Sequence, residues 1–222
     1  MLITFSGIVG SGKSTNAKQT HRFLQEAGYP AVYLRFRFLK ARRILRALFV
    51  KKHQAISPVP KKTKTPRHTT TLRHQAILKL TLTRTVVYLW RIMLFRIFAA
   101  IRLRRKIIIV DRFYYDSLVH YSLIGRFERF YLALIKTALP RPQLALMLIA
   151  PPRTILHRRP NYDGAYVQQL YHNYLQLAKT FPHLVVLQTD SFSNLTANIS
   201  QYVRQTVARA SEANPLQPKI LL

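Results

Sequence analysis

The feature that most constrains the fold is the segment GIVGSGKS at residues 7–14, which fits the pattern G-x-x-x-x-G-K-[ST]. It directly follows an apolar run at residues 2–5 and directly precedes a segment with helical character. A loop of this kind joins a strand to a helix, and its backbone N–H groups curl around phosphate with the helix dipole behind them. The segment therefore predicts a phosphate-binding loop (P-loop) in an α/β fold.

Each polar residue of this loop has an expected task. Lys13 is expected to point into open phosphate space and to reach the β- and γ-phosphates of ATP. The Ser14 hydroxyl is the expected direct ligand of Mg²⁺, and Thr15 is expected to start the helix. The predicted cofactors are ATP and Mg²⁺, and the predicted cofactor-binding residues are Gly7, Gly10, Ser11, Gly12, Lys13, Ser14 and Thr15.

Short apolar runs alternate with helix-length segments, which is typical of a parallel sheet. The expected strands are 2–5, 31–34, 107–110, 144–149 and 184–187, and the expected helices are 14–27, 39–51, 72–103, 126–139, 153–158, 165–180 and 195–210. With 222 residues and 49% hydrophobic content, the chain supports one core. We predict a single domain over 1–210 with a tail over 211–222. Its fold is a three-layer P-loop NTPase fold with a five-stranded parallel sheet and helices on both faces.

Positive charge is the strongest compositional feature, because 36 Lys and Arg stand against 7 Asp and Glu, a formal net charge of +29. A chain of this charge attracts polyanions. No carboxylate lies between Glu26 and Asp111, and basic runs fill residues 35–106. We expect this region to be helical, to lie on the acceptor side and to contain a flexible loop at 53–70. It is either a set of solvated helix faces or a docking surface for nucleic acid or anionic membrane.

Missing residue types exclude several classes of site. The chain has no cysteine, which excludes disulfides and cysteine catalysis, and its histidines lack the H-E-x-x-H spacing of a zinc site. The first residues lack the parts of a secretory signal. The most apolar window, 86–101, is interrupted by Arg91 and Arg96, which favours a buried helix over a membrane span. We expect a cytoplasmic protein, with peripheral contact to membrane or nucleic acid as an open alternative.

A buried strand that ends in an acid and an arginine provides a second signal. Residues 107–110 read IIIV and lead into Asp111 and Arg112. Ligands of parallel α/β proteins bind at the carboxyl ends of the strands. Asp111 is therefore expected to hold Mg²⁺ through water and Arg112 to bridge substrate phosphates, and Asp111 or Asp116 could act as base for a hydroxyl acceptor. The alternative is a strand-end turn with a surface ion pair.

A third segment leads from the expected strand 144–149 through Pro151 and Pro152 into a short basic helix. Together the three segments resemble the thymidylate kinase family, whose pattern joins a P-loop, an Asp-Arg-aromatic strand end and a Pro-Pro helix before an arginine-bearing lid. The resemblance extends from Met1 to about Tyr202 and is weakest over 36–103. It implies ATP-dependent phosphoryl transfer of the nucleoside or nucleotide kinase type, with a lid at 153–164 and a homodimer as a possible assembly. It assigns catalysis to Lys13, Asp111, Arg112 and Arg158, and metal binding to Ser14 and Asp111.

The acceptor side is where the chain departs from that family. Val9 stands where the family has an acid that contacts the acceptor sugar, and His120 and Tyr121 stand where a glutamine commonly follows. The chain is therefore closer to divergent thymidylate-kinase-like proteins. Two other functions stay open: a non-catalytic P-loop protein that docks on nucleic acid or anionic membrane, and a kinase that acts on nucleic-acid ends. The candidate acceptor-binding residues are Arg91, Arg112 and Tyr115, with Tyr88 and Trp90 either stacking on a base or belonging to the core.

Overall fold

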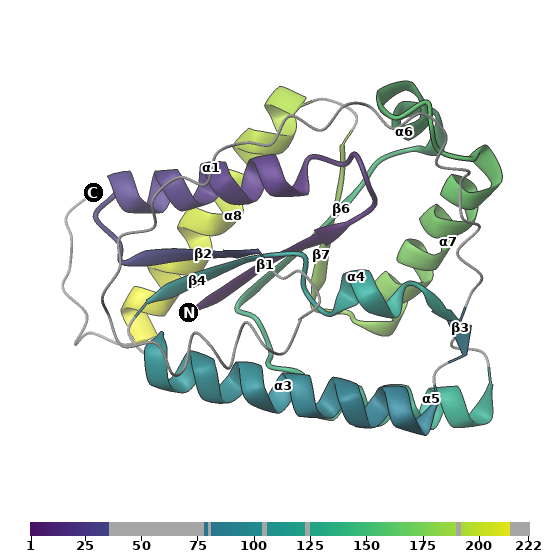
Figure 1. The fold of residues 1–222 in the computed structure, drawn as a ribbon. Helices are drawn as coiled ribbons and strands as arrows, with labels where there is room; N and C mark the ends of the chain where they lie inside the picture. Colours follow the sequence, from purple (N-terminus) through teal and green to yellow (C-terminus); the bar gives the residue numbers. More distant parts are fainter. Residues whose placement is uncertain (36–77, 80, 104–105, 123–124, 190–191, 214–222) are drawn as a thin grey trace, which may run out of the picture.

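The computed structural model describes residues 1–35, 78–79, 81–103, 106–122, 125–189 and 192–213 (Figure 1). A five-stranded parallel sheet forms its centre, in the order β2-β4-β1-β6-β7. Its strands are β1 (Leu2–Gly7), β2 (Ala31–Arg35), β4 (Ile107–Asp111), β6 (Leu144–Ile149) and β7 (Leu184–Gln188). β1, β4 and β6 are buried over their whole length, which agrees with their mostly apolar sequences. The predicted five-stranded parallel sheet is confirmed.

Helices cover both faces of the sheet (Figure 1). One face carries α1 (Lys13–Glu26) and α8 (Phe192–Ala213), and the other carries α3 (Leu82–Arg102), α5 (Arg126–Ala138) and α7 (Gly164–Thr180). Alternate strand residues enter separate cores: Ile109 packs with α1 and α8, whereas Ile108 packs with α3, α5 and α7. This is the predicted three-layer fold. Two short helices, α4 (Tyr115–Leu118) and α6 (Pro152–Arg158), follow β4 and β6 in the chain.

Two predicted boundaries are wrong. The helix predicted for 72–103 begins only at Leu82, because Leu78–Lys79 forms β3, which pairs in parallel with β5 (Tyr121–Ser122). Thr81 has an extended backbone, with φ −100° and ψ 162°, and its carbonyl accepts the first helical N–H bond, as an N-cap residue does. α8 extends to Ala213, into the predicted tail 211–222, and ends two residues before Pro215, a residue that disfavours a helical conformation at the position before it.

Some expectations fall on residues that the structure does not describe. The helix predicted for 39–51, the loop at 53–70 and the last residues of the tail lie outside the described ranges. The apolar window 86–101 lies within α3. In the part of the chain that is described, none of the helices has the length and apolar content of a bilayer-spanning segment.

Candidate functional site

The loop between β1 and α1 is curled in the way its glycines predict. Gly7, Gly10 and Gly12 have φ angles of 140°, 80° and 82°, a region that residues with a Cβ rarely adopt. At Gly7 a Cβ would also lie 1.9 Å from the Leu148 carbonyl oxygen of β6. Glycine is therefore required where β1 leaves the sheet. Gly12 precedes α1 directly, so the curled backbone continues into the amino end of that helix.

The sequence predicted that Lys13 points into open space, and this prediction is wrong. Its side chain is 5% exposed, and Nζ donates to the Ile8 carbonyl oxygen at 2.7 Å. Burial lowers the pKa of Lys13; Asp116 and Asp111 act in the opposite sense, and Arg112 adds to the lowering. The ammonium group thus lies inside the loop, and the charges of Asp111, Arg112 and Asp116 all act on it.

The polar side chains beside Lys13 fit an anion. The Ser11 hydroxyl is buried and has no hydrogen-bond partner among the described residues, whereas most buried polar atoms have one. Ser14 is half-buried in the first turn of α1, and Thr15 next to it is exposed. A buried hydroxyl without a partner, in a loop of backbone N–H groups, is suited to a phosphate oxygen.

Asp111 ends β4, directly beside β1, where it is in register with Phe5. The residue is fully buried. Its Oδ2 accepts a hydrogen bond from the Tyr33 hydroxyl at 2.8 Å and lies 3.6 Å from Nε of Arg35. Its Oδ1 has no partner among the described residues. A buried carboxylate with one oxygen unused at this edge of the sheet suits a hard cation or a water bound to it.

Tyr33 and Arg35 are site residues that sequence reasoning missed. Both belong to β2, and the register of the sheet places Arg35 opposite Asp111. Burial, together with the hydrogen bond to Asp111, raises the pKa of Tyr33 to about 12. The only signal in the sequence was their position at the end of the second apolar run, which becomes informative once β2 is known to adjoin β4.

Arg112 has a strained backbone. Its φ of 70° is the only positive value of a non-glycine residue in the described ranges, and such outliers gather at functional sites. Its N–H donates to the Phe5 carbonyl oxygen at 2.9 Å, which holds the turn after β4 against β1. Its positive charge acts on both Lys13 and Asp116. The turn therefore keeps the arginine beside the phosphate-binding loop.

Asp116, from α4, is tied to the loop itself. Its Oδ1 accepts hydrogen bonds from the Gly7 N–H at 2.9 Å and from the Tyr174 hydroxyl of α7 at 2.6 Å. Its Oδ2 is buried and has no partner among the described residues. Burial raises the pKa of Asp116, and the charge of Lys13 opposes that effect. The sequence indicated this residue only as one of two candidate bases. Its position five residues after Asp111 was the one feature that could have predicted its contact with the loop.

The lid arginine reaches the same loop from α6. Nη1 of Arg158 donates to the Gly10 carbonyl oxygen at 3.1 Å, and Cγ of Arg159 lies 3.8 Å from the place that a Cβ on Gly10 would occupy. Both arginines are exposed. Residues 153–164, the expected lid, thus begin with a helix whose last turn touches the phosphate-binding loop.

Tyr115, in contrast, is not at the site, and the expectation that it binds substrate is wrong. Its side chain is 1% exposed and packs on Phe113 and Phe181, and its hydroxyl shares a hydrogen bond of 2.6 Å with Nε2 of His183. The sequence placed it next to an Asp-Arg pair, but α4 turns the ring into the core under the sheet.

Arg91 lines a cavity of about 200 Å³ between α3 and β5, together with Tyr88 and Tyr121. The other lining residues are Thr83, Arg84 and Val87. Tyr88 is 4% exposed and belongs to the core, whereas Trp90 is 56% exposed; two residues apart on a helix, their side chains point in nearly opposite directions. Arg91 therefore lines a cavity, as an acceptor-binding residue would, but Tyr88 and Trp90 do not form one surface on which a base could stack.

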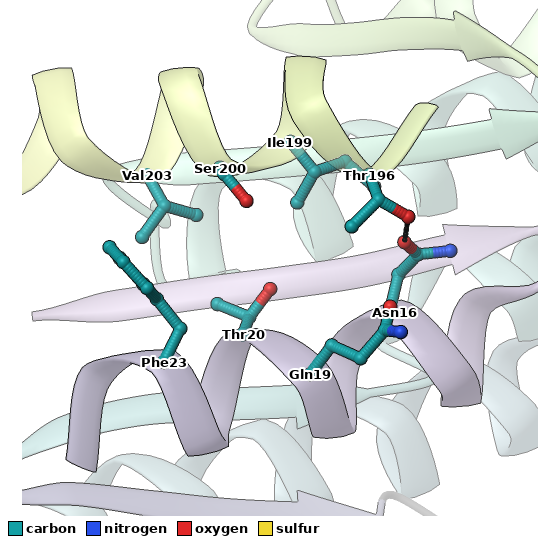
Figure 2. A pocket seen from close by; sticks show the side chains of 8 residues that line it. All are labelled: Asn16, Gln19, Thr20, Phe23, Thr196, Ile199, Ser200 and Val203. Carbon is teal, nitrogen blue, oxygen red and sulfur yellow. Dashed lines mark hydrogen bonds between the residues drawn. The ribbon is translucent and has the colours of Figure 1, made fainter. Parts of the chain in front are cut away.

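A second cavity, of about 220 Å³, lies between α1 and α8 (Figure 2). Asn16 connects it with the loop, because Nδ2 donates to the Gly12 carbonyl oxygen at 3.0 Å while Oδ1 accepts from the Thr196 hydroxyl at 3.3 Å. The remaining lining residues are Gln19, Thr20, Phe23, Ile199, Ser200 and Val203. None of these side chains is charged, so this cavity lacks the cations that a phosphate site uses.

Metal binding at this site would rest on few protein ligands. No group of three or more His, Asp or Glu side chains that could hold a metal ion occurs in the described residues. Mg²⁺ that is bound with a nucleotide needs only one or two protein oxygens, because phosphates and waters supply the others. Ser14 and Asp111 are the two side chains that the sequence predicts as its ligands.

Comparison with known proteins addresses the fold. The sequence matches no protein-family model, and a search of curated proteins finds no match. A solved structure of thymidylate kinase from Ehrlichia chaffeensis resembles this chain with a TM-score of 0.53 and 17% sequence identity, over 92% of this chain and 98% of that one. The chain has a divergent P-loop kinase-like fold. At this identity the likeness concerns the fold alone, so the roles of single residues depend on the geometry of the site.

Proposed function

We propose that this protein is a kinase of the nucleotide-kinase type, which transfers the γ-phosphoryl group of ATP to a nucleoside or nucleotide. The observation that carries the proposal is the gathering of Lys13, Asp111, Arg112 and Arg158 around one glycine loop, from three separate parts of the chain. Three buried oxygens of the same site, on Ser11, Asp111 and Asp116, have no hydrogen-bond partner among the described residues. One solved structure that resembles this chain is a thymidylate kinase, which favours a nucleotide as acceptor.

The donor side follows from the residues present. The loop amides, the Ser11 hydroxyl and Lys13 would hold the phosphates of ATP, and Ser14 and Asp111 would hold Mg²⁺. When bound, MgATP supplies the phosphoryl group, and its Mg²⁺ offsets the negative charge of the phosphates. To reach a phosphate oxygen, Nζ of Lys13 would exchange its bond to the neutral Ile8 carbonyl for a bond to an anionic oxygen, in which both partners are charged.

The arginines act where negative charge gathers during transfer. Arg112 is fixed by its strained turn and its backbone bond to β1, so its guanidinium needs little reorganisation to face the transferring group. Arg158 reaches the loop from α6 and would neutralise the same charge. If the acceptor is a hydroxyl, Oδ2 of Asp116 is suited to take its proton, because a carboxyl with a raised pKa is a better base.

Two substitutions test the proposal. Lys13→Met should weaken ATP binding about tenfold to a hundredfold, the loss expected for one charge-assisted hydrogen bond. Asp111→Asn should leave measurable nucleotide binding, because the loop and Lys13 still hold the phosphates. It should remove most Mg²⁺-dependent turnover, because the metal loses its carboxylate ligand. Matched controls are Lys18→Met and Glu26→Gln, which remove a charge of the same sign from exposed positions on α1. Calorimetry measures ATP affinity, and a coupled assay with a panel of nucleosides, nucleotides and oligonucleotide ends measures turnover.

The alternatives give different results. ATP binding without turnover on any acceptor of the panel would favour the non-catalytic P-loop protein, and turnover on oligonucleotide ends alone would favour the nucleic-acid-end kinase. A folded Lys13→Met variant with the ATP affinity of the wild type would refute the phosphate-binding role of the loop.

A further inference from the structure

α3 presents apolar side chains on two nearly opposite sides. Its inner row packs in the core and includes Tyr88, Ile92 and Phe95, which are at most 4% exposed. Its outer row follows the same three-and-four-residue spacing, and each member is between 42% and 65% exposed: Leu82, Val86, Trp90, Met93, Ile97 and Ile101. An exposed helix face is normally polar. An apolar row along the whole length of α3 is therefore a surface that is suited to contact something other than water.

α5 adds a second exposed apolar row. Phe127 is 74% exposed, Phe130 is 59% exposed and Leu134 is 38% exposed. α3 and α5 pack against each other, and Nη1 of Arg96 joins them through a 3.4 Å hydrogen bond to the Ala138 carbonyl oxygen. Together they form the edge of the molecule on the side of the sheet away from α1 (Figure 1). We call the nine residues of the two outer rows the α3–α5 face.

The charge around this face has one sign. α3 contains four arginines and no acidic residue, and α5 contains two arginines and a lysine against the single Glu128. Arg96, Arg126 and Arg129 are exposed. The face thus combines bulky apolar side chains with an excess of cations, on a chain whose formal net charge is +29.

The partner that complements this face must be apolar and negatively charged at once. A second copy of the chain would cover the apolar rows but would bring arginines against arginines without enough carboxylates to pair them. A polynucleotide would supply phosphates but no apolar cover for Trp90, Phe127 and Phe130. An anionic lipid surface supplies both, because its acyl boundary accepts apolar side chains and its headgroups pair with Lys and Arg.

We propose that the α3–α5 face binds the surface of an anionic membrane, with α3 lying in the plane of the interface. Trp90, Phe127 and Phe130 enter the boundary between headgroups and acyl chains, where tryptophan is favoured. The exposed arginines stay at the level of the lipid phosphates. The phosphate-binding loop, formed between β1 and α1, is not part of the face, so bound nucleotide and bound membrane do not compete.

The position of Trp90 makes the proposal measurable, because it is the only tryptophan of the chain. The full-length protein is mixed with vesicles of phosphatidylcholine, or of phosphatidylcholine with phosphatidylglycerol. With the anionic vesicles we expect flotation of the protein, a shift of Trp90 emission to shorter wavelength, and quenching by brominated acyl chains. With neutral vesicles we expect binding to be weaker by about a hundredfold, since each of the three exposed arginines contributes about 1 kcal/mol near an anionic surface.

Variants separate the apolar contribution from plain charge attraction. Phe127→Ser combined with Phe130→Ser should weaken binding to anionic vesicles about tenfold or more, because two bulky apolar side chains no longer leave water. Val186→Ser combined with Tyr202→Ser is the matched control, since these residues are also exposed but lie on β7 and α8; its binding should equal that of the wild type. Thermal melts establish that both double variants remain folded.

Three outcomes would overturn the proposal. Anionic vesicles that bind the protein without changing Trp90 emission, and equally well after the Phe127 and Phe130 substitutions, would show attraction by charge elsewhere. A concentration-dependent dimer in sedimentation velocity that shifts Trp90 emission without lipid would assign the face to a second copy. An equal emission shift with an oligonucleotide would assign it to nucleic acid.

Discussion

Replacement of Gly7 by alanine should disrupt the base of the phosphate-binding loop. The new Cβ would lie 1.9 Å from the carbonyl oxygen of Leu148 and 2.9 Å from its nitrogen. Both atoms are backbone of β6, which pairs with β1 at this residue, so neither can move aside without disturbing the sheet. Overpacking costs about 1–3 kcal/mol, and the φ of 140° adds about 1–3 kcal/mol of backbone strain for a residue with a Cβ. We expect a loss of about 2–6 kcal/mol in the free energy of unfolding.

Alanine substitutions at two other glycines distinguish the cost of backbone strain from the cost of a steric clash of the new Cβ. Gly10 has a φ of 80°, but the nearest neighbour of an added Cβ would be Cγ of the flexible Arg159 side chain at 3.8 Å, so Gly10→Ala should cost only the strain, about 1–2 kcal/mol. Gly164 begins α7 and would meet only Cδ1 of Leu156 at 3.8 Å. Gly164→Ala should stabilise the protein by about 0.4–1 kcal/mol, because alanine restricts the unfolded chain.

Equilibrium unfolding in urea, followed by far-ultraviolet circular dichroism, measures all three variants under one condition. The expected order of stability is Gly164→Ala, wild type, Gly10→Ala, Gly7→Ala. If Gly7→Ala is no less stable than Gly10→Ala, the close approach of the loop to β6 is absent and the placement of the loop against the sheet is wrong.

Three further substitutions concern the side chains around the loop. Asp116→Asn should raise the free energy of unfolding at neutral pH, because burial raises the pKa of this carboxyl above its ordinary 3.8; the wild-type contribution is present below that value and is lost as pH rises through the raised pKa. The gain should therefore vanish in acid, which urea unfolding at acidic and neutral pH would reveal. Arg158→Ala should leave the melting temperature unchanged but lower kcat about a hundredfold or more in steady-state kinetics. Tyr33→Phe should cost about 1 kcal/mol of stability and raise the Mg²⁺ concentration needed for half-maximal turnover, since Asp111 loses a hydrogen bond.

The sequence predicted the sheet well because its central strands are buried on both faces. β1, β4 and β6 are apolar apart from Thr4, Ser6 and Asp111, and every residue of the three strands is buried. The two-residue strands β3 and β5 were missed, because two residues are too short to show a period. The start of α3 was placed too early, since the local pattern does not reveal that Leu78–Lys79 pairs with a segment more than forty residues away.

The site was predicted only as far as its residues are local in the chain. The loop and the Asp111-Arg112 pair are contiguous patterns, and the structure brings them together at adjacent strands. The contacts of Tyr33 and Arg35 with Asp111 depend on the order of the strands, which no single segment encodes. The surroundings of Lys13 and Tyr115 likewise come from residues that are distant in the chain: Asp111 and Asp116 lie near Lys13, and Phe181 and His183 contact Tyr115. For that reason both orientations were wrongly expected.

The position of β1 has a consequence for synthesis of the chain. β1 lies between β4 and β6 in the sheet, yet it is the first strand to leave the ribosome, and β4 begins only about a hundred residues later. β2, the next strand to emerge, cannot pair with β1 because β4 lies between them. The nascent chain therefore carries an unpaired apolar segment for about half of its elongation, which makes it a target for chaperones and prone to aggregation. The loop that follows β1 accordingly reaches its final surroundings only after β4 and β6 have been synthesised.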